Sequence, residues 1–240
     1  MSGPVFDIKS LISEEAQVPP RRNLSTEAAD ALRDLILLEK LAPGTPVPER
    51  DVAAGLGISR TPLKEALRIL ENEGLIEYGP TRRPRVANPS IEELSQYISV
   101  LGALEALAGE TACKLATDEE IIAIGAINSR LLGLPRAVTD LEFFRLDMEF
   151  HGAIVTAARN APLGQTHRQY NARLWRARFM SSRQSDRRAN TLAEHCAIVE
   201  ALSARDSRRT ANALRNHLKS TIRNISRICE SSESQDSVST

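Results

Sequence analysis

Apolar residues recur every three or four positions along most of this chain, and that spacing predicts a mainly α-helical protein. In its first third, an amphipathic helix is expected from Leu24 to Leu38, and a later helix begins near residues 59–61 and ends at Gly74. Two short strands are expected at Leu75–Tyr78 and Arg85–Ala87, joined by the basic segment GPTRRP. The first third of the chain thus combines short helices with a small β-hairpin.

Helix-start signals divide the rest of the chain. A Ser or Thr is followed three residues later by Glu at three places, which is the pattern of a capping box. These pairs are Ser90 and Glu93, Thr117 and Glu120, and Thr139 and Glu142. Helices are therefore expected from 91 to about 116, 117 to about 133 and 139 to about 159, and by periodicity over 163–182, 186–204 and 206–230. Helices without intervening strands predict an all-α bundle of six or seven helices.

The composition agrees with a helical protein and limits the cellular compartments in which the protein is expected. Aromatic residues make up 4% of the 240 residues. No run of about 18 apolar residues is present, so no contact with a membrane is expected. The N-terminus lacks a signal-peptide pattern, and the three cysteines have no paired spacing, which favours a reducing, cytoplasmic setting.

We expect an N-terminal arm (1–23), a domain containing the hairpin (24–89), a helical domain (90–230) and a polar, disordered tail (231–240).

The order of elements within residues 47–86 is typical of a winged helix-turn-helix, a module that places one helix in the DNA major groove. Its second helix carries Arg60, Lys64 and Arg68 four residues apart, and therefore on one face. The opposite face is apolar, as expected for a helix packed on a small core. The formal net charge of the chain is zero, so the indication of DNA binding is local to this helix and the wing. The alternative is that these charges only cover a solvated face.

This region closely resembles the DNA-binding half of the GntR family of bacterial transcription regulators. The matching segments are PER at 48–50, LGISRTPLKEALRILENEGLI at 56–76 and the wing at 82–86. The resemblance implies a double-stranded, palindromic operator, which a homodimer reads with two recognition helices about one DNA turn apart. The residues expected at the DNA are Arg50, Ser59, Arg60, Thr61, Lys64, Arg68, Arg82 and Arg83. Two positions depart from the family pattern: Lys64 replaces an Arg, and Pro84 replaces the Gly of the wing tip.

The four histidines supply the candidate chemistry of the helical domain. Asp147 precedes His151 by four residues, so both side chains project from one helical face. His195 and His217 lie in the last two helices, on faces that also carry aliphatic side chains. Three imidazoles and one carboxylate converging inside a bundle would suit Zn²⁺, Ni²⁺ or another divalent metal, with positions open for a ligand. Alternatively, each histidine is a core residue bonded to a backbone carbonyl, and Asp147 pairs with a nearby arginine.

A second resemblance covers about Ser90 to Arg227, which is similar to the FCD ligand-binding domain of the FadR subfamily of GntR regulators. The segments that carry it are LDMEFHGAI (146–154), AARNAPL (157–163), EHCAIVEAL (194–202) and ALRNHL (213–218). In metal-binding members an Asp and three His occur in the same order. The resemblance therefore implies a divalent metal, most of all Zn or Ni, held by Asp147, His151, His195 and His217. His167 matches nothing in this pattern and is expected on the surface, whereas Cys196 is expected to be buried without binding the metal.

The same resemblance implies a small organic acid as the effector, but the usual anchor is missing. Many such domains carry an Arg four residues before the position of Glu105, where this chain has Leu101. The arginine-rich stretch 168–188 is the candidate substitute, and we expect Arg173 and Arg176 to reach an anion. The alternative is that these arginines lie on a solvated face, or on the side of a dimer partner or DNA.

These features predict a DNA-binding transcription regulator, a repressor or an activator, whose operator affinity responds to a small carboxylate effector at the metal site. A metal-dependent enzyme that uses the three-His, one-Asp site is the alternative. A structural metal site without an effector is a third possibility. No serine stands in a nucleophile-elbow context and no phosphate-binding loop occurs, so the sequence offers no other catalytic motif.

Overall fold

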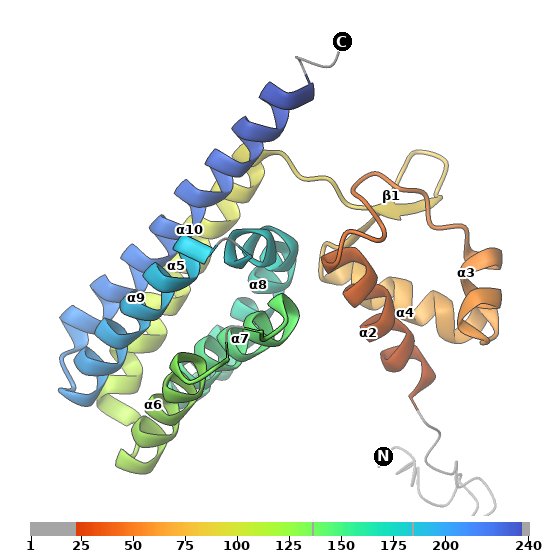
Figure 1. The fold of residues 1–240 in the computed structure, drawn as a ribbon. Helices are drawn as coiled ribbons and strands as arrows, with labels where there is room; N and C mark the ends of the chain where they lie inside the picture. Colours follow the sequence, from red (N-terminus) through yellow and green to blue (C-terminus); the bar gives the residue numbers. More distant parts are fainter. Residues whose placement is uncertain (1–22, 136, 184, 237–240) are drawn as a thin grey trace, which may run out of the picture.

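The computed structural model describes residues 23–135, 137–183 and 185–236, which form two units (Figure 1). The winged unit contains α2 (Leu24–Leu37), α3 (Glu49–Leu56), α4 (Arg60–Asn72), β1 (Ile76–Tyr78) and β2 (Pro84–Val86). The helical unit contains α5 (Ile91–Leu115), α6 (Asp118–Leu132), α7 (Asp140–Ala157), α8 (Ala161–Ser182), α9 (Ser185–Ser203) and α10 (Ser207–Asp236). The predicted N-terminal arm falls, except for Asn23, outside the described residues. None of the described helices is long and apolar enough to cross a membrane.

The winged unit is built on one apolar core. α4 buries the apolar face that the sequence predicts against α2, and this apolar stripe consists of Leu63, Ala66, Leu67 and Leu70. Gly57 follows α3 with φ at 66°, a left-handed backbone that glycine adopts readily, and this permits the sharp turn into α4. The antiparallel hairpin closes the core, with Ile76 paired opposite Val86. The helix-turn-helix and the small wing predicted from the sequence are confirmed.

The tip of the wing differs from the prediction. Pro84 does not lie at the tip but in β2, where it is buried and paired opposite Tyr78. Proline fits there because it is tolerated as the first residue of a strand. The left-handed residue of the turn is Arg82, with φ at 53°, and its amide donates to the carbonyl of Gly79. A glycine is therefore favoured by the backbone at position 82, not at position 84.

The helical unit is an all-α bundle, as predicted. α5 and α10 are its longest helices and run side by side along one edge of the bundle (Figure 1). They approach closely at Gly109, where a Cβ atom would lie 2.4 Å from Leu214 Cδ1. Apolar side chains from α5, α6, α7, α9 and α10 fill the main core. Beside this core, the bundle buries polar side chains of α5, α7, α8, α9 and α10.

All three predicted capping boxes are present. In each, the Ser or Thr side chain accepts from the backbone amide of the Glu, whose carboxylate accepts from the amide of the Ser or Thr. These reciprocal bonds fix where α5, α6 and α7 begin. The other end of the chain departs from the prediction, because α10 continues to Asp236. The expected disordered tail is therefore wrong for 231–236, and 237–240 lie outside the described residues.

Candidate metal centre and nucleic-acid interface

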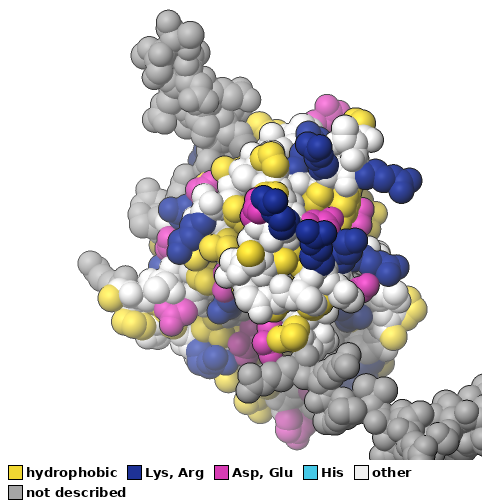
Figure 2. Space-filling view, turned by 90° about the vertical axis from the view of Figure 1, so that its right-hand side faces the viewer, with side chains coloured by type: hydrophobic (Ala, Val, Ile, Leu, Met, Phe, Trp, Pro, Cys, Tyr) yellow, Lys and Arg dark blue, Asp and Glu magenta, His cyan; other side chains and the backbone are white. Residues whose placement is uncertain are grey.

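The recognition helix α4 presents a cationic face to solvent. Arg60, Lys64 and Arg68 are exposed on the side opposite the buried apolar stripe. The other residues expected at the DNA are exposed as well: Arg50, Ser59, Thr61, Arg82 and Arg83. Figure 2 shows Lys and Arg side chains gathered on the side of the molecule that carries the winged unit. These positions lie where a phosphate backbone can reach them.

Inside the helical unit, three histidines from three helices converge. His151 of α7, His195 of α9 and His217 of α10 each offer a ring nitrogen, and these nitrogens lie within 4.8 Å of one another. All three side chains are buried, with ring centroids between 4.9 and 5.3 Å apart. Phe150 stacks on the ring of His195 at 4.2 Å and covers one side of the cluster. The fold thus brings together the three histidines that the sequence singles out.

Asp147 adds a carboxylate to this cluster. Its Oδ1 lies 3.4 Å from Nε2 of His195. Among the described residues, Oδ1 of Asp147, Nε2 of His151 and both ring nitrogens of His195 are buried without a hydrogen-bond partner. Each such atom costs about 1–3 kcal/mol if it stays unsatisfied. Three imidazoles and one carboxylate are a donor set that divalent first-row metals accept, so a bound cation fits these residues.

Two further carboxylates hold the histidine rings from outside the cluster. Nδ1 of His151 donates to Glu105 at 2.8 Å, and Nδ1 of His217 donates to Glu194 at 2.7 Å. Because an ionised carboxylate only accepts, each pair fixes the ring proton on Nδ1 and leaves the lone pair on Nε2. Glu194 is held in turn by Arg187, at 3.1 Å. Carboxylates in this position are typical of metal sites, where they orient the ligating ring.

The surroundings of the cluster favour the neutral forms of His195 and His217. Burial lowers the pKa of His195 well below its ordinary value, and charges on His217 and His151 lower it further. Burial also lowers the pKa of His217, although its bond to Glu194 opposes this shift. Burial alone would raise the pKa of Glu194, but hydrogen bonds from His217 and Arg187 bring it down to about 2. Neutral imidazoles beside ionised carboxylates are the protonation states that metal binding requires.

Two members of this buried network, His167 and Arg178 of α8, were not predicted from the sequence. The prediction of a surface position for His167 is wrong, because its side chain is buried with Nε2 3.3 Å from Oε1 of Glu105. Arg178 is buried too, and its Nη1 lies 3.5 Å from the same oxygen. Burial alone would raise the pKa of Glu105, yet His151, His167 and Arg178 hold it well below its usual range. Both side chains lie on one stripe of α8 that contains positions 167, 171, 174 and 178, but the sequence of this helix does not show which stripe faces the bundle.

The two arginines expected at the effector lie away from the histidines. Arg173 packs over the ring of Tyr97 and against Gly74, and Arg176 pairs with Glu39 at 3.2 Å. Both therefore face the winged unit, and the structure brings neither to the cluster.

Cys196 also departs from its expected place. It is exposed rather than buried, because it points about 100° away from His195 and thus toward solvent.

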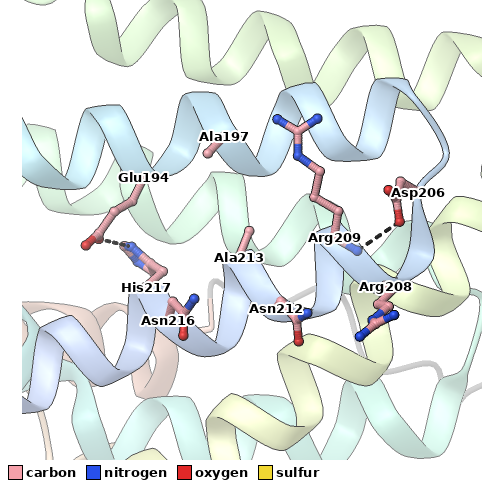
Figure 3. A pocket seen from close by; sticks show the side chains of 9 residues that line it. All are labelled: Glu194, Ala197, Asp206, Arg208, Arg209, Asn212, Ala213, Asn216 and His217. Atoms are coloured by element: carbon pink, nitrogen blue, oxygen red, sulfur yellow. Dashed lines mark hydrogen bonds and ion pairs between the residues drawn. The ribbon is translucent and has the colours of Figure 1, made fainter.

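A surface groove lies beside the cluster, between α9 and α10. It has a volume of about 490 Å³. Figure 3 shows His217 and Glu194 toward one end of the groove and Arg208 and Arg209 toward the other. The side chain of Asn216 lies next to His217 on the same wall (Figure 3). The groove therefore offers a small polar molecule a place next to one of the candidate metal ligands.

Comparisons with known proteins agree with this architecture. Residues 24–86 match the bacterial regulatory proteins of the gntR family, and residues 96–220 match the FCD domain. The chain is 32% identical over 206 residues to a probable D-xylose utilization operon transcriptional repressor of Paenarthrobacter nicotinovorans, covering 82% of this chain and 88% of that one. It is 30% identical over 203 residues to an uncharacterized HTH-type transcriptional regulator of Streptomyces ambofaciens, covering 82% and 83% respectively.

A solved structure shares the whole fold. E. coli McbR/YncC superposes with a TM-score of 0.73 at 18% identity, covering 86% of this chain and 99% of that one. A winged DNA-binding unit joined to a helical ligand-binding unit defines the class, a DNA-binding transcription regulator. Within that class, the chain belongs to the GntR family of bacterial regulators and carries an FCD domain. The family resemblance drawn from the sequence is confirmed.

Proposed function

We propose that this protein is a transcriptional repressor whose operator affinity is set by a small organic acid bound at a divalent metal ion. The observation that carries the proposal is the buried cluster of Asp147, His151 and His195, in which Oδ1 of Asp147, Nε2 of His151 and both ring nitrogens of His195 lack hydrogen-bond partners among the described residues. The other unit presents an exposed cationic recognition helix, which supplies the site that the effector regulates. The direction of regulation follows relatives named as repressors, among them RspR of E. coli, 27% identical over 206 residues.

The proposed ligands of the metal are Asp147, His151, His195 and His217, and the ion is Zn²⁺ or Ni²⁺. When bound, such an ion keeps coordination positions open for a carboxylate oxygen. Arg178 is a buried cation beside the same cluster, with Nη2 3.9 Å from Oδ2 of Asp147. We therefore propose that Arg178 binds the carboxylate of the effector, the role that the sequence suggests for Arg173 and Arg176. The groove between α9 and α10 is the proposed route by which the effector reaches His217.

The proposed DNA-binding form is a homodimer. Its two recognition helices, about one DNA turn apart, read a palindromic operator. Arg60 and Lys64 are the proposed base-reading residues of α4. The other exposed residues expected at the DNA are proposed to contact phosphates; these are Arg50, Ser59, Thr61, Arg68, Arg82 and Arg83. The regulation is a linkage, in which an effector that prefers one arrangement of the winged units shifts the affinity for DNA.

The metal site is tested by elemental analysis of protein purified without chelator. One divalent metal per chain is expected, and His195→Ala should lower the occupancy to a small fraction of that value. Cys196→Ser is the matched control, because Cys196 is the next residue of the same helix but is exposed. Equal occupancy in the two variants would contradict the ligand assignment.

The effector is sought with a thermal-shift screen of organic acids on metal-loaded and chelator-treated protein. A hit is expected to raise the melting temperature of the loaded form and to change operator affinity in a gel-shift titration. An acid that acts equally on both forms would show that the metal does not bind the effector. Turnover of the hit by metal-loaded protein would favour the metal-dependent enzyme instead of the regulator.

A further inference from the structure

An apolar contact centred on α8 holds the two units together. Leu37 of α2, Phe144 of α7 and Phe179 of α8 form one buried cluster. Trp175 packs against this cluster, with its ring perpendicular to that of Phe144 at a centroid distance of 5.9 Å. The guanidinium of Arg33, also on α2, lies 5.4 Å from the centroid of the Trp175 ring. Side chains of α8 thus hold α2 of the winged unit through both apolar and cation–π contacts.

Ion pairs border this contact. Asp34 of α2 pairs with Arg145 of α7 at 2.7 Å, and Glu39 pairs with Arg176 of α8 at 3.2 Å. These side chains are partly or largely exposed, and pairs of this kind contribute only about 0–1 kcal/mol each. The contact therefore depends mainly on its small apolar centre, and a modest change in α8 is enough to loosen it. The cationic face of α4 stays exposed while the units are in contact.

A neighbouring side of α8 faces the histidine–aspartate cluster through Arg178, which lies about 100° around the helix from Phe179. Its Nη1 donates to Oδ1 of Asn171 at 2.6 Å and lies 3.5 Å from Oε1 of Glu105, while its Nη2 lies 3.9 Å from Oδ2 of Asp147. Nδ2 of Asn171 donates to the sulfur of Met148 at 3.7 Å. Met148 in turn packs on the apolar contact between the units. One helix therefore joins the candidate metal site to the winged unit.

We propose that α8 couples the two units: Arg178 responds to the charge at the histidine–aspartate cluster, and Trp175 and Phe179 transmit its displacement to α2. This inference rests on the proposed metal site. In the metal-free protein Arg178 supplies positive charge to Asp147. A divalent cation held by Asp147 takes over that role and repels the guanidinium. Phe179 directly follows Arg178 in the same helix, so movement of Arg178 loosens the contact with the winged unit.

The chain contains a built-in reporter of this contact, because Trp175 is its only tryptophan. The full-length protein is stripped with chelator, dialysed and titrated with Zn²⁺ alone. Bound zinc is measured by elemental analysis, and exposure of Trp175 by acrylamide quenching of its fluorescence. Quenching is expected to rise as zinc fills one site per chain. Arg178→Met should bind zinc without this rise, whereas Arg168→Met, an exposed position of the same helix, should respond like the wild type.

A second variant tests the coupling without altering the cluster. Leu37→Ala weakens the apolar contact from the side of α2. Because coupling between sites is reciprocal, the affinity for Zn²⁺ should rise, by about 5-fold or more if the coupling has the usual allosteric size. If Arg178→Met does not fold, this measurement still tests the coupling.

The outcomes separate the coupling from the metal site. Zinc uptake that leaves the quenching of Trp175 unchanged, or a response that persists in Arg178→Met, overturns the coupling and leaves the metal site standing. Equal zinc affinities in Leu37→Ala and wild type overturn it as well. A protein that takes up no zinc at its histidines overturns the proposed metal site, and the coupling with it.

Discussion

The winged unit and the helical unit use charged residues in opposite ways. On α4, Arg60, Lys64 and Arg68 point into water, where a charge can be replaced at small cost to the fold. In the bundle, Glu105 and Arg178 are buried, with Oε1 and Nη1 3.5 Å apart. A buried charge is tolerated only while its partners remain, because removing one partner leaves the other without compensation. The charges on the exposed face of α4 are therefore separable from stability, whereas the charges of the bundle are not.

The difference also separates the two kinds of binding site. The face of α4 is already exposed, so it is complete before its partner arrives. The histidine–aspartate cluster is incomplete, since four of its buried polar atoms lack hydrogen-bond partners among the described residues. Substitutions on α4 should therefore change DNA binding and leave stability intact, whereas substitutions in the bundle should change stability.

The largest effect is expected from Glu105→Ala. Glu105 accepts from His151 at 2.8 Å and is flanked by His167 and Arg178, so its loss leaves a buried cation uncompensated. The free energy of unfolding should fall by about 3–5 kcal/mol. Urea denaturation of the metal-free protein measures the change. Glu110→Ala, on the same helix but at a more exposed ion pair, is the control and should cost less than about 1 kcal/mol; equal losses would contradict the contrast between the units.

Acid should disturb the same network gradually. The pKa values of His195 and His217 are lowered in the folded protein, so below about pH 6.5 the unfolded chain binds more protons. The stability of the metal-free protein should therefore decrease as the pH falls below about 6.5, and change little from these groups above it. Urea midpoints across this range check the sign. His195→Ala should flatten the profile, and a wild-type midpoint independent of pH would refute the assignment of neutral, buried histidines.

On the winged unit, Arg60→Ala should weaken specific DNA binding by about 1–3 kcal/mol if Arg60 reads a base edge. Stability should be unchanged, because Arg60 is exposed. Fluorescence anisotropy at fixed salt measures the affinity for a palindrome selected from random DNA and the affinity for random DNA. The ratio of the two affinities should fall in Arg60→Ala. Arg130→Ala on α6, an exposed arginine of the helical unit, is the matched control. An Arg60→Ala protein that discriminates as well as wild type would remove this residue from the base-reading set.

The parts of the fold that depend on neighbouring residues were predictable from the sequence. A capping box involves residues three apart, so Ser90, Thr117 and Thr139 mark the starts of their helices without knowledge of the rest of the fold. The apolar stripe of α4 is equally local. The histidines that converge were recognisable from the order of residues in a known family, whereas spacing within one helix does not show that three helices meet.

The parts that depend on how α8 is rotated were not predictable. Arginines occur around much of this helix, so its polar pattern does not identify the side that faces the bundle. Arg176 and Arg178 point about 200° apart at about 100° per residue, which is why one reaches Glu39 and the other Glu105. The expectation that His167 lies on the surface is wrong for the same reason. Only the packing of α8 between α5, α7 and the winged unit decides these positions.

The smallest predicted difference is that between two Gly→Ala variants, and it concerns the contact between the two units. Gly74 has φ at 70°, and a Cβ atom there would lie 2.6 Å from Cγ of Arg173 on α8. Gly57 has φ at 66° with open space around it, so Gly57→Ala measures the backbone cost alone, about 1–2 kcal/mol. Gly74→Ala should cost more than Gly57→Ala. Cγ of Arg173 is close to the backbone of α8, so it cannot move away from the new methyl group unless the whole Arg173 side chain or the helix shifts. Urea denaturation of the variants gives the difference, and adding Arg173→Ala should bring Gly74→Ala down to the cost of Gly57→Ala. If Arg173→Ala changes nothing, the winged unit does not rest against α8 at this point in solution, and the units are held together by the apolar contact around Trp175 and the ion pairs that border it.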